Sequence, residues 1–325
     1  MEMPSLTIGE LTARLPIVQG GMAVRISMAP LASAVAEAGG IGLIAGSGLE
    51  PDELGAEVRS AREASQGIVG VNVMVAVRKF KDLVQRAIAE GAQLVVAGAG
   101  FSRDVFEWGR SAGVPVVPIV GSERVAKLAQ RFGASAVVVE GVEAGGHLGT
   151  SEPLRELLPR IVEAVRIPVI GAGGIVTGAD IKETLDLGAA GVQIGSRFAA
   201  TVESSASEAF KRMYVEAGED DIVLVKSPVG LPGRALRNPF IEGLERDEYP
   251  RIERCVACLK ECGKDYCIID RLVRAQKGDV TTGLVFAGSS AARVRDVPPV
   301  SELMERLVSE YGEACAAEAT AGGEA

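Results

Sequence analysis

The sequence predicts an α/β fold, a (β/α)8 TIM barrel with a C-terminal cysteine-containing extension. Apolar β-type runs alternate with helical patterns eight times along the chain. The runs are apolar at consecutive positions, which is typical of parallel strands covered on both faces. An open doubly wound sheet would alternate in the same way. Eight units without a domain-sized insertion favour a closed barrel.

The expected elements follow one another at short intervals. Strands are predicted at Leu15–Gln19, Gly40–Ile44, Ile68–Val73, Leu94–Ala97, Val114–Val120, Ala136–Glu140, Ile167–Ala172 and Ala190–Gly195. Helices are predicted at Met28–Ala38, Asp52–Ser65, Phe80–Glu90, Ser102–Ala112, Ser122–Phe132, Glu152–Val165, Ala179–Leu187 and Ser204–Ala217. Ser102 and Ser122 are expected as N-caps. Helix ends are indicated by Gly39, Gly91, Gly113, Gly133 and Gly188.

The alternation of predicted strands and helices stops at residue 217. We therefore expect the chain to consist of a barrel and two further parts. Residues 1–217 are expected to form the barrel, and residues 218–312 a substrate-side and cysteine-cluster segment packed on it. The last helix is predicted at about Val300–Tyr311. The acidic, alanine-rich residues 313–325 are expected to be a disordered tail.

Composition limits the class of function. A net charge of -9 without a long basic run argues against nucleic-acid binding. No apolar stretch is long enough to span a membrane, and the N-terminus lacks an export signal, so we expect a cytoplasmic protein. The oligomeric state is open, with a homodimer as one option.

Glycine gathers in the loops that follow the predicted strands, which form the reaction face of such a barrel. The loops after the seventh and eighth strands contain Gly173-Gly174-Ile175 and Gly195-Ser196. Barrels bind phosphate at this place with backbone N–H groups. The pattern therefore predicts a phosphorylated ligand, and FMN, another phosphorylated cofactor or a sugar phosphate would fit.

The loop after the sixth strand contains the only histidine of the chain, His147, preceded by the glycine pair Gly145-Gly146. Imidazole exchanges protons near neutral pH, which makes His147 the candidate catalytic group. The alternative is a histidine that only satisfies a turn. Glu140 and Glu143 could orient the ring, although for Glu143 a role in capping a local turn is favoured. Arg197 could support the phosphate or pair with an acid.

Seven motifs in order resemble the nitronate monooxygenase family, which includes the FMN-dependent enoyl-ACP reductases of type II. The resemblance covers about residues 5–215, with weaker likeness to about residue 310. Its motifs are Pro16–Met22, Gly39–Gly42, Gly70–Asn72, Gly98–Gly100, Glu140–Gly149, Ile170–Ile175 and Gly188–Phe198.

The resemblance implies a barrel that binds FMN without a covalent bond. It places Gly20, Gly21 and Met22 near the flavin ring and makes Asn72 and Gln193 polar contacts. Glu140, Gly145 and Gly146 lie in the loop expected to face the cofactor. The resemblance assigns the phosphate to Gly173, Gly174, Gly195 and Ser196, and it makes His147 the active-site histidine.

A departure from the family is the cluster Cys255, Cys258, Cys262 and Cys267, spaced C-x2-C-x3-C-x4-C. Thiolates at this spacing can converge on one zinc ion or one [4Fe–4S] cluster. The first three are locally similar to the iron–sulfur segment of dienoyl-CoA reductases. Buried, unliganded cysteines are the alternative.

The function predicted first is oxidation of alkyl nitronates by O2, with FMN as electron relay and His147 at the substrate. The second is NAD(P)H-dependent reduction of an enoyl thioester or quinone. The third is a non-catalytic phosphate-binding barrel that interacts through its cysteine segment. An acyl carrier protein would need a local basic patch on this acidic chain, for which Arg234 and Arg237 are the candidates.

Overall fold

The computed structural model describes residues 2–322 and confirms the predicted barrel. Eight parallel strands close in the order β10-β11-β3-β4-β5-β6-β7-β8. The strands are β3 (Ile17–Gln19), β4 (Ile41–Ala45), β5 (Ile68–Met74), β6 (Val95–Gly98), β7 (Val116–Val120), β8 (Val137–Glu140), β10 (Val169–Ala172) and β11 (Gly191–Ile194). Each lies within one of the eight predicted strands or extends it by a single residue.

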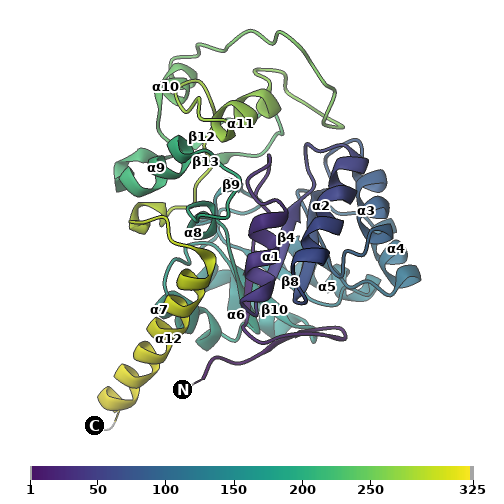
Figure 1. Cartoon of the computed structure of the whole chain (residues 1–325), viewed down its shortest axis with the longest axis vertical. Helices are drawn as coiled ribbons and strands as arrows, with labels where there is room; N and C mark the ends of the chain where they lie inside the picture. Colours follow the sequence, from purple (N-terminus) through teal and green to yellow (C-terminus); the bar gives the residue numbers. More distant parts are fainter. Residues whose placement is uncertain (1, 323–325) are drawn as a thin grey trace.

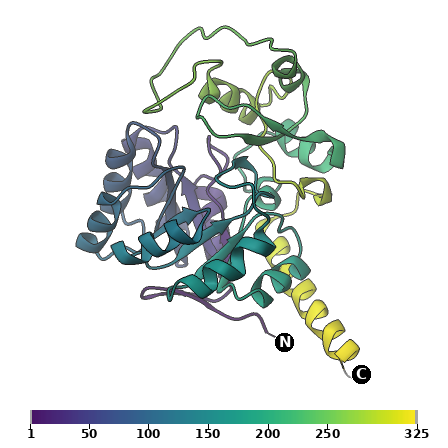
Figure 2. The ribbon, with the colours of Figure 1, turned by 180° about the vertical axis from the view of Figure 1, so that it is seen from behind.

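Helices cover the outside of the barrel, as Figures 1 and 2 show from opposite sides. They are α1 (Ala29–Glu37), α2 (Pro51–Ala64), α3 (Phe80–Ala89), α4 (Asp104–Ala112), α5 (Glu123–Phe132), α6 (Leu154–Ala164), α7 (Gly178–Asp186) and the short α8 (Ser196–Ala199). Ser122 caps α5 as predicted, because its side chain accepts from the Val125 N–H. The prediction for Ser102 was wrong, since α4 begins after Arg103 without a side-chain cap.

A hairpin that the sequence analysis missed closes the N-terminal end of the barrel. It consists of β1 (Leu6–Ile8) and β2 (Leu11–Ala13). Leu6 and Ile8 are fully buried and pack with Val18, Leu43 and other inward-facing side chains of the strands. This end of the barrel is therefore filled by apolar side chains.

Residues 218–290, which we call the cover, lie over the opposite end of the barrel (Figure 1). After α9 (Glu208–Glu216) and η1 (Glu219–Asp221), the chain forms β12 (Ile222–Val225), β13 (Gly233–Leu236), α10 (Pro239–Glu245) and α11 (Ile268–Gln276). A three-stranded sheet joins β12 and β13 to β9 (Gly146–His147), which belongs to the loop after β8. After the cover comes η2 (Ala291–Arg293).

The C-terminal helix α12 (Val300–Gly322) corrects the predicted tail. It continues past Tyr311 instead of ending there, and residues 323–325 lie outside the described residues. Alanine is the strongest helix former, so the alanine-rich segment extends the helix. Cys315 is buried, and Glu318 pairs with Lys182 of α7, which fixes the extension to the barrel.

Candidate active site

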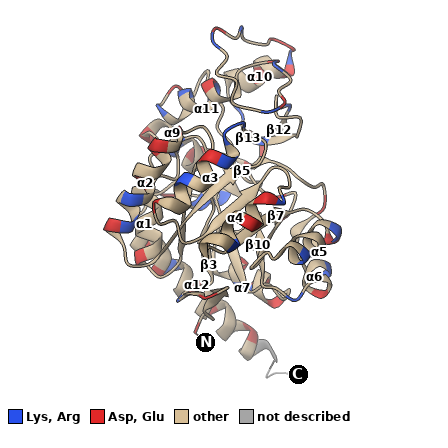
Figure 3. Ribbon diagram, turned by 90° about the vertical axis from the view of Figure 1, so that its right-hand side faces the viewer, with Lys and Arg blue, Asp and Glu red and all other residues tan. Residues whose placement is uncertain are grey.

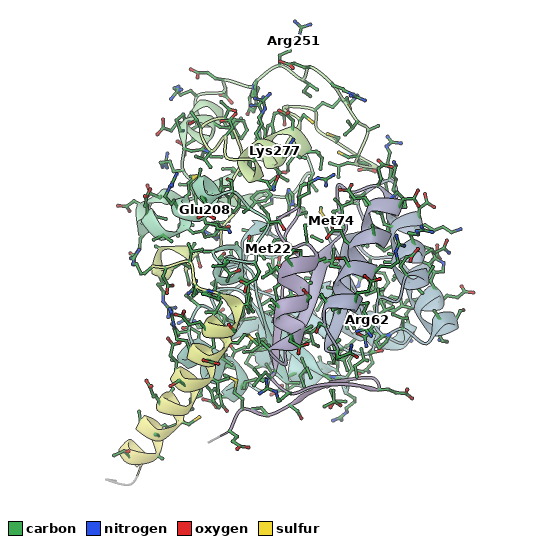
Figure 4. The ribbon with its side chains drawn as sticks, viewed as in Figure 1. Met22, Arg62, Met74, Glu208, Arg251 and Lys277 are labelled. Carbon is green, nitrogen blue, oxygen red and sulfur yellow. The ribbon has the colours of Figure 1, made fainter. Side chains whose placement is uncertain are left out.

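A cavity of about 560 Å³ opens at the carboxyl ends of the barrel strands, beneath the cover. Met22 and Met74, two of its lining residues, lie at the junction of barrel and cover (Figure 4). All thirteen residues predicted for catalysis and cofactor binding line this cavity: Gly20, Gly21, Met22, Asn72, Glu140, Gly145, Gly146, His147, Gly173, Gly174, Gln193, Gly195 and Ser196. The structure brings the set together, and the role of each member stays a prediction.

Polar side chains replace the apolar interior at the upper end of three strands. Ala172 of β10 is in register with Glu140 of β8 on one side and with Gln193 of β11 on the other. Asn72 of β5 donates to the carbonyl oxygen of Val96 at 3.3 Å. The Oε1 atom of Gln193 is buried and has no hydrogen-bond partner within residues 2–322. A buried polar atom without a partner is costly, which indicates that a ligand supplies one.

The loops after β10 and β11 present backbone to the cavity. Gly173 and Gly174 have φ angles of 117° and 76°, a region that favours glycine. A Cβ at Gly195 would meet no atom within 4 Å, so this position borders open space. The Ser196 hydroxyl accepts from the Gly288 N–H at 2.8 Å and keeps its own hydrogen to donate. These loops fit a phosphate.

His147 lies in β9, where it pairs with Gly233 of β13. Its Nε2 atom is 2.7 Å from the Ser227 Oγ atom, and its ring meets the Phe286 ring edge-on at a centroid distance of 5.0 Å. Burial lowers the pKa of His147 to about 4, because desolvation penalises the imidazolium form. The ring is therefore neutral at neutral pH and can accept a proton.

The pKa of Glu140 shifts in the opposite direction, and burial is again the cause. Desolvation penalises the carboxylate and raises the pKa of Glu140 to about 7. Between about pH 4 and pH 7, both Glu140 and His147 are therefore uncharged. Among the described residues, no lysine or arginine lines the cavity. The Glu143 carboxylate is also part of the lining, so the cavity offers no cation to an anionic substrate.

Two other charged residues have local roles. Glu143 caps a helix and not the local turn that was predicted, because its carboxylate accepts from the Leu154 N–H that begins α6, at 3.0 Å. Arg197 pairs with Asp296 at 2.6 Å, which decides between the two predicted roles in favour of an acid partner.

The arginines considered for a basic patch are also engaged within the chain. Arg234 donates to the Val142 carbonyl oxygen at 2.8 Å, and Arg237 pairs with Glu245 at 2.6 Å. Over the rest of the surface, acidic and basic side chains are interspersed (Figure 3).

The four clustered cysteines lie in the cover on a long segment between α10 and α11. Near its start, Arg251 marks the end of the molecule farthest from the C-terminus (Figure 4). All four are free thiols, and within residues 2–322 no three metal-binding side chains gather as a metal site. The segment is held to the barrel by the Arg78 N–H, which donates to the Cys258 carbonyl oxygen at 2.9 Å. Zinc and [4Fe–4S] binding therefore stay predictions.

Sequence reasoning expected residues 218–312 on the substrate side but identified none of the side chains with which this segment and α9 complete the cavity wall. Apolar side chains from α9, α11 and neighbouring loops line it, together with the small residues Gly288 and Ser290: Phe210, Tyr214, Leu231, Leu272, Leu284 and Phe286. Ser227 was also missed. The run Gly288-Ser289-Ser290 was the one available signal, because small residues of this kind often approach phosphate.

The arrangement fits a flavin mononucleotide on three observations. The glycine-bordered loops after β10 and β11 suit its phosphate, and the unpartnered Gln193 Oε1 atom suits a ring N–H. Gly20 and Gly21 follow β3, the strand next to β11, and line the cavity without side chains of their own, which suits a flat ring system. A phosphate subsite beside a proton-exchanging group at the mouth of a closed barrel is the layout of a cofactor-dependent barrel enzyme.

Comparison with known proteins specifies this class further. The family model described as nitronate monooxygenase matches residues 5–90 and 68–310. The chain belongs to the nitronate monooxygenase family, and it is an oxidoreductase. A relative from Mycobacterium tuberculosis is 35% identical over 77% of this chain and 70% of its own length. It is named (3aS,4S,5R,7aS)-5-hydroxy-7a-methyl-1-oxo-octahydro-1H-indene-4-carboxyl-CoA dehydrogenase.

Solved structures share the whole architecture. FabK from Thermotoga maritima has a TM-score of 0.84 and 33% identity, covering 94% of this chain and 95% of its own. A nitroalkane oxidase from Streptomyces ansochromogenes has a TM-score of 0.80 and 28% identity, covering 94% and 98% of the two chains. Within the described residues, no helix is long and apolar enough to cross a membrane.

Proposed function

We propose that this protein is an FMN-dependent reductase of an electrophile whose reacting group is uncharged, an enoyl thioester or a quinone, with NAD(P)H as electron donor. The observation that carries the proposal is the charge of the cavity. Its wall contains no lysine or arginine among the described residues, and Glu140 and His147 are both uncharged between about pH 4 and pH 7. Burying an unpaired anionic reacting group beside these two side chains is costly, whereas an uncharged reacting group pays no such cost. The phosphate of FMN is expected to be bound instead by backbone N–H groups of the loops after β10 and β11.

This charge pattern reverses the order in which the sequence placed the two enzymatic functions. An alkyl nitronate is an anion, and the carboxylate of Glu143 also lines the cavity. The relative named as a dehydrogenase of a carboxyl-CoA compound supports a thioester, because its name gives one. Nitronate oxidation stays the alternative, supported by relatives such as the probable nitronate monooxygenase of Staphylococcus saprophyticus, 27% identical over 96% of this chain.

Some residues of the chain orient the substrate, and His147 exchanges a proton or a hydrogen bond with it. FMN, when bound, supplies the transfer of electrons between donor and substrate. Phe210, Leu231, Leu272 and Phe286 form an apolar wall that holds the substrate body and excludes water. The neutral His147 ring lies at the edge of that wall and exchanges a proton or a hydrogen bond with the substrate.

Anaerobic reduction of the purified holoenzyme tests the proposal. NADH or NADPH is expected to bleach the flavin absorbance rapidly, and a short enoyl-CoA or a benzoquinone is expected to restore it. Propyl-2-nitronate is the comparison substrate, and it is expected to bleach the flavin slowly or not at all. Bleaching by the nitronate alone would reject the reductase and leave the nitronate oxidation. A purified protein that takes up no FMN would support the non-catalytic barrel instead.

A further inference from the structure

We propose that Ser227 is a positioning residue for His147, whose hydroxyl group holds the Nε2 atom so that Nδ1 faces the cavity in a single tautomer. The proposal deepens the proposed function, because it matters for turnover only if His147 acts on the substrate. The arrangement of the ring itself does not depend on that function.

The first argument is the contact between the two side chains. The Ser227 Oγ atom and the His147 Nε2 atom are 2.7 Å apart, a short hydrogen bond between side chains distant in the sequence. Ser227 is 8% exposed, so water competes little for this bond. Within residues 2–322, no hydrogen bond is formed by the Nδ1 atom of His147, and the residue lines the cavity. Nδ1 is therefore the nitrogen available to a ligand.

The second argument is that both partners are fixed by their backbones. His147 lies in β9, which pairs with β13, and Ser227 lies in the loop that joins β12 to β13. The Val229 N–H donates to the Ser227 Oγ atom at 3.3 Å, which holds the hydroxyl group in its loop. The Phe286 ring meets the imidazole edge-on and restricts its rotation. The sheet of β9, β12 and β13 therefore positions both the imidazole ring and the Ser227 hydroxyl group.

The third argument is chemical. A neutral imidazole has one nitrogen that donates and one that accepts a hydrogen bond. The group bound to one nitrogen decides which role is left to the other. Because the Ser227 Oγ atom already accepts from the Val229 N–H, we assign the hydroxyl hydrogen to Nε2, which leaves Nδ1 to carry the ring hydrogen before a substrate arrives. Without that partner, the ring would exchange between two tautomers, and only one of them would suit the reaction.

Because the chain contains a single histidine, the tautomer of the His147 ring can be measured directly. In holoenzyme labelled with ¹⁵N-histidine, the ring nitrogens of His147 give the only side-chain histidine signals. The wild type is expected to show the widely separated pair of shifts of one neutral tautomer. Ser227→Ala is expected to move both shifts toward the averaged position, and Ser227→Thr, which keeps a hydroxyl group, is expected to restore the separation.

Kinetics provide the second readout. Ser227→Ala is expected to lower kcat about tenfold, the effect of one ordinary hydrogen bond, with little change in KM. Ser204→Ala is the matched control, because Ser204 is also buried and its hydroxyl also accepts from the amide two residues on, that of Ala206. It makes no contact with His147, so neither shifts nor kcat should change.

Two results would overturn the proposal. One is a wild-type spectrum with averaged shifts, which would remain informative even if Ser227→Ala failed to fold. The other is a Ser227→Ala spectrum that matches the wild type. Failure of the proposed function has a different signature: His147→Ala would keep full turnover while the tautomer still changed in Ser227→Ala.

Discussion

The rim of the barrel, by which we mean the carboxyl ends of its strands and the loops that follow them, lines the same cavity as the cover. The two parts contribute different groups to it. The rim offers backbone: glycines after β3, β10 and β11, and a row of three side chains, Glu140, Ala172 and Gln193, set by strand register. The cover offers side chains, namely an apolar wall and the Ser227 hydroxyl group that contacts His147. From this difference we infer that the rim binds the proposed FMN and that the cover selects and orients the substrate.

The strongest test of this division adds a charge to the rim. Gly195→Asp is expected to abolish FMN binding. The position tolerates a side chain, because its φ of -105° is ordinary and a Cβ there meets open space. Two like charges about 4 Å apart repel by about 4 kcal/mol at an effective dielectric of 20, roughly 10³-fold in affinity. Flavin content after purification and FMN titration provide the measurement.

Gly312→Asp is the matched control, because a Cβ at this position in α12 also meets open space away from the cavity. It should bind FMN like the wild type. Full flavin occupancy in Gly195→Asp would place the phosphate elsewhere.

A change in β9, where the loop after β8 pairs with the cover, should leave the cofactor bound. His147→Ala is expected to keep FMN and to lower turnover by about 10²–10⁴-fold, the usual contribution of a general acid–base group. In the wild type, the acid limb of kcat/KM should lie near pH 4, because burial lowers the pKa of His147 to about 4. Unchanged turnover of the variant on the identified substrate would remove His147 from the chemistry.

Glu140 allows a test of rim electrostatics without any substrate. Its pKa is raised from 4.5 to about 7 in the folded protein, so folding stabilises its protonated form. This stabilisation is complete below about pH 4.5 and is lost as the pH rises to about 7. The free energy of unfolding of flavin-free protein should fall by about 3 kcal/mol over that interval.

Glu140→Gln should remove this slope, which urea unfolding at several pH values can measure. Glu63→Gln, at an exposed position of α2, serves as the control. A slope that persists in Glu140→Gln would assign the proton to another group.

The smallest effect is expected for the cysteines of the cover. Cys255 and Cys262 are exposed, and none of the four clustered cysteines lines the cavity. Cys255→Ser with Cys262→Ser should leave FMN content and the rate of flavin reduction unchanged. Analysis of iron, sulfide and zinc in the anaerobically purified wild type tests the metal prediction separately. Loss of flavin in the double variant would contradict the division between rim and cover.

The rim could be predicted from the sequence because its signals are local. Strands covered on both faces give continuous apolar runs, and the glycines and His147 follow these runs directly. The contact between His147 and the cover could not be predicted in this way. His147 belongs to a two-residue strand whose partner, β13, lies far along the chain, and Ser227 has no sequence feature that distinguishes it from other serines. The hairpin of β1 and β2 was missed because its strands have only three residues each.

The prediction of a disordered C-terminal tail was wrong because it considered only the composition of the segment and no surface against which the segment could pack. Acidic residues and small side chains indicated disorder, yet alanine favours helix, and α7 supplies a surface on which Cys315 is buried. Here too, the structure of a segment depends on a contact with residues that are distant in the sequence.

The hairpin of Leu6 and Ile8 has a consequence for the order of events. Since the hairpin packs on the apolar interior at one end of the barrel, we expect every molecule that reaches the cavity to enter and leave at the other end. We expect the nicotinamide donor to depart before the acceptor arrives. Steady-state rates should therefore give parallel lines in double-reciprocal plots, the pattern of two reactants that take turns.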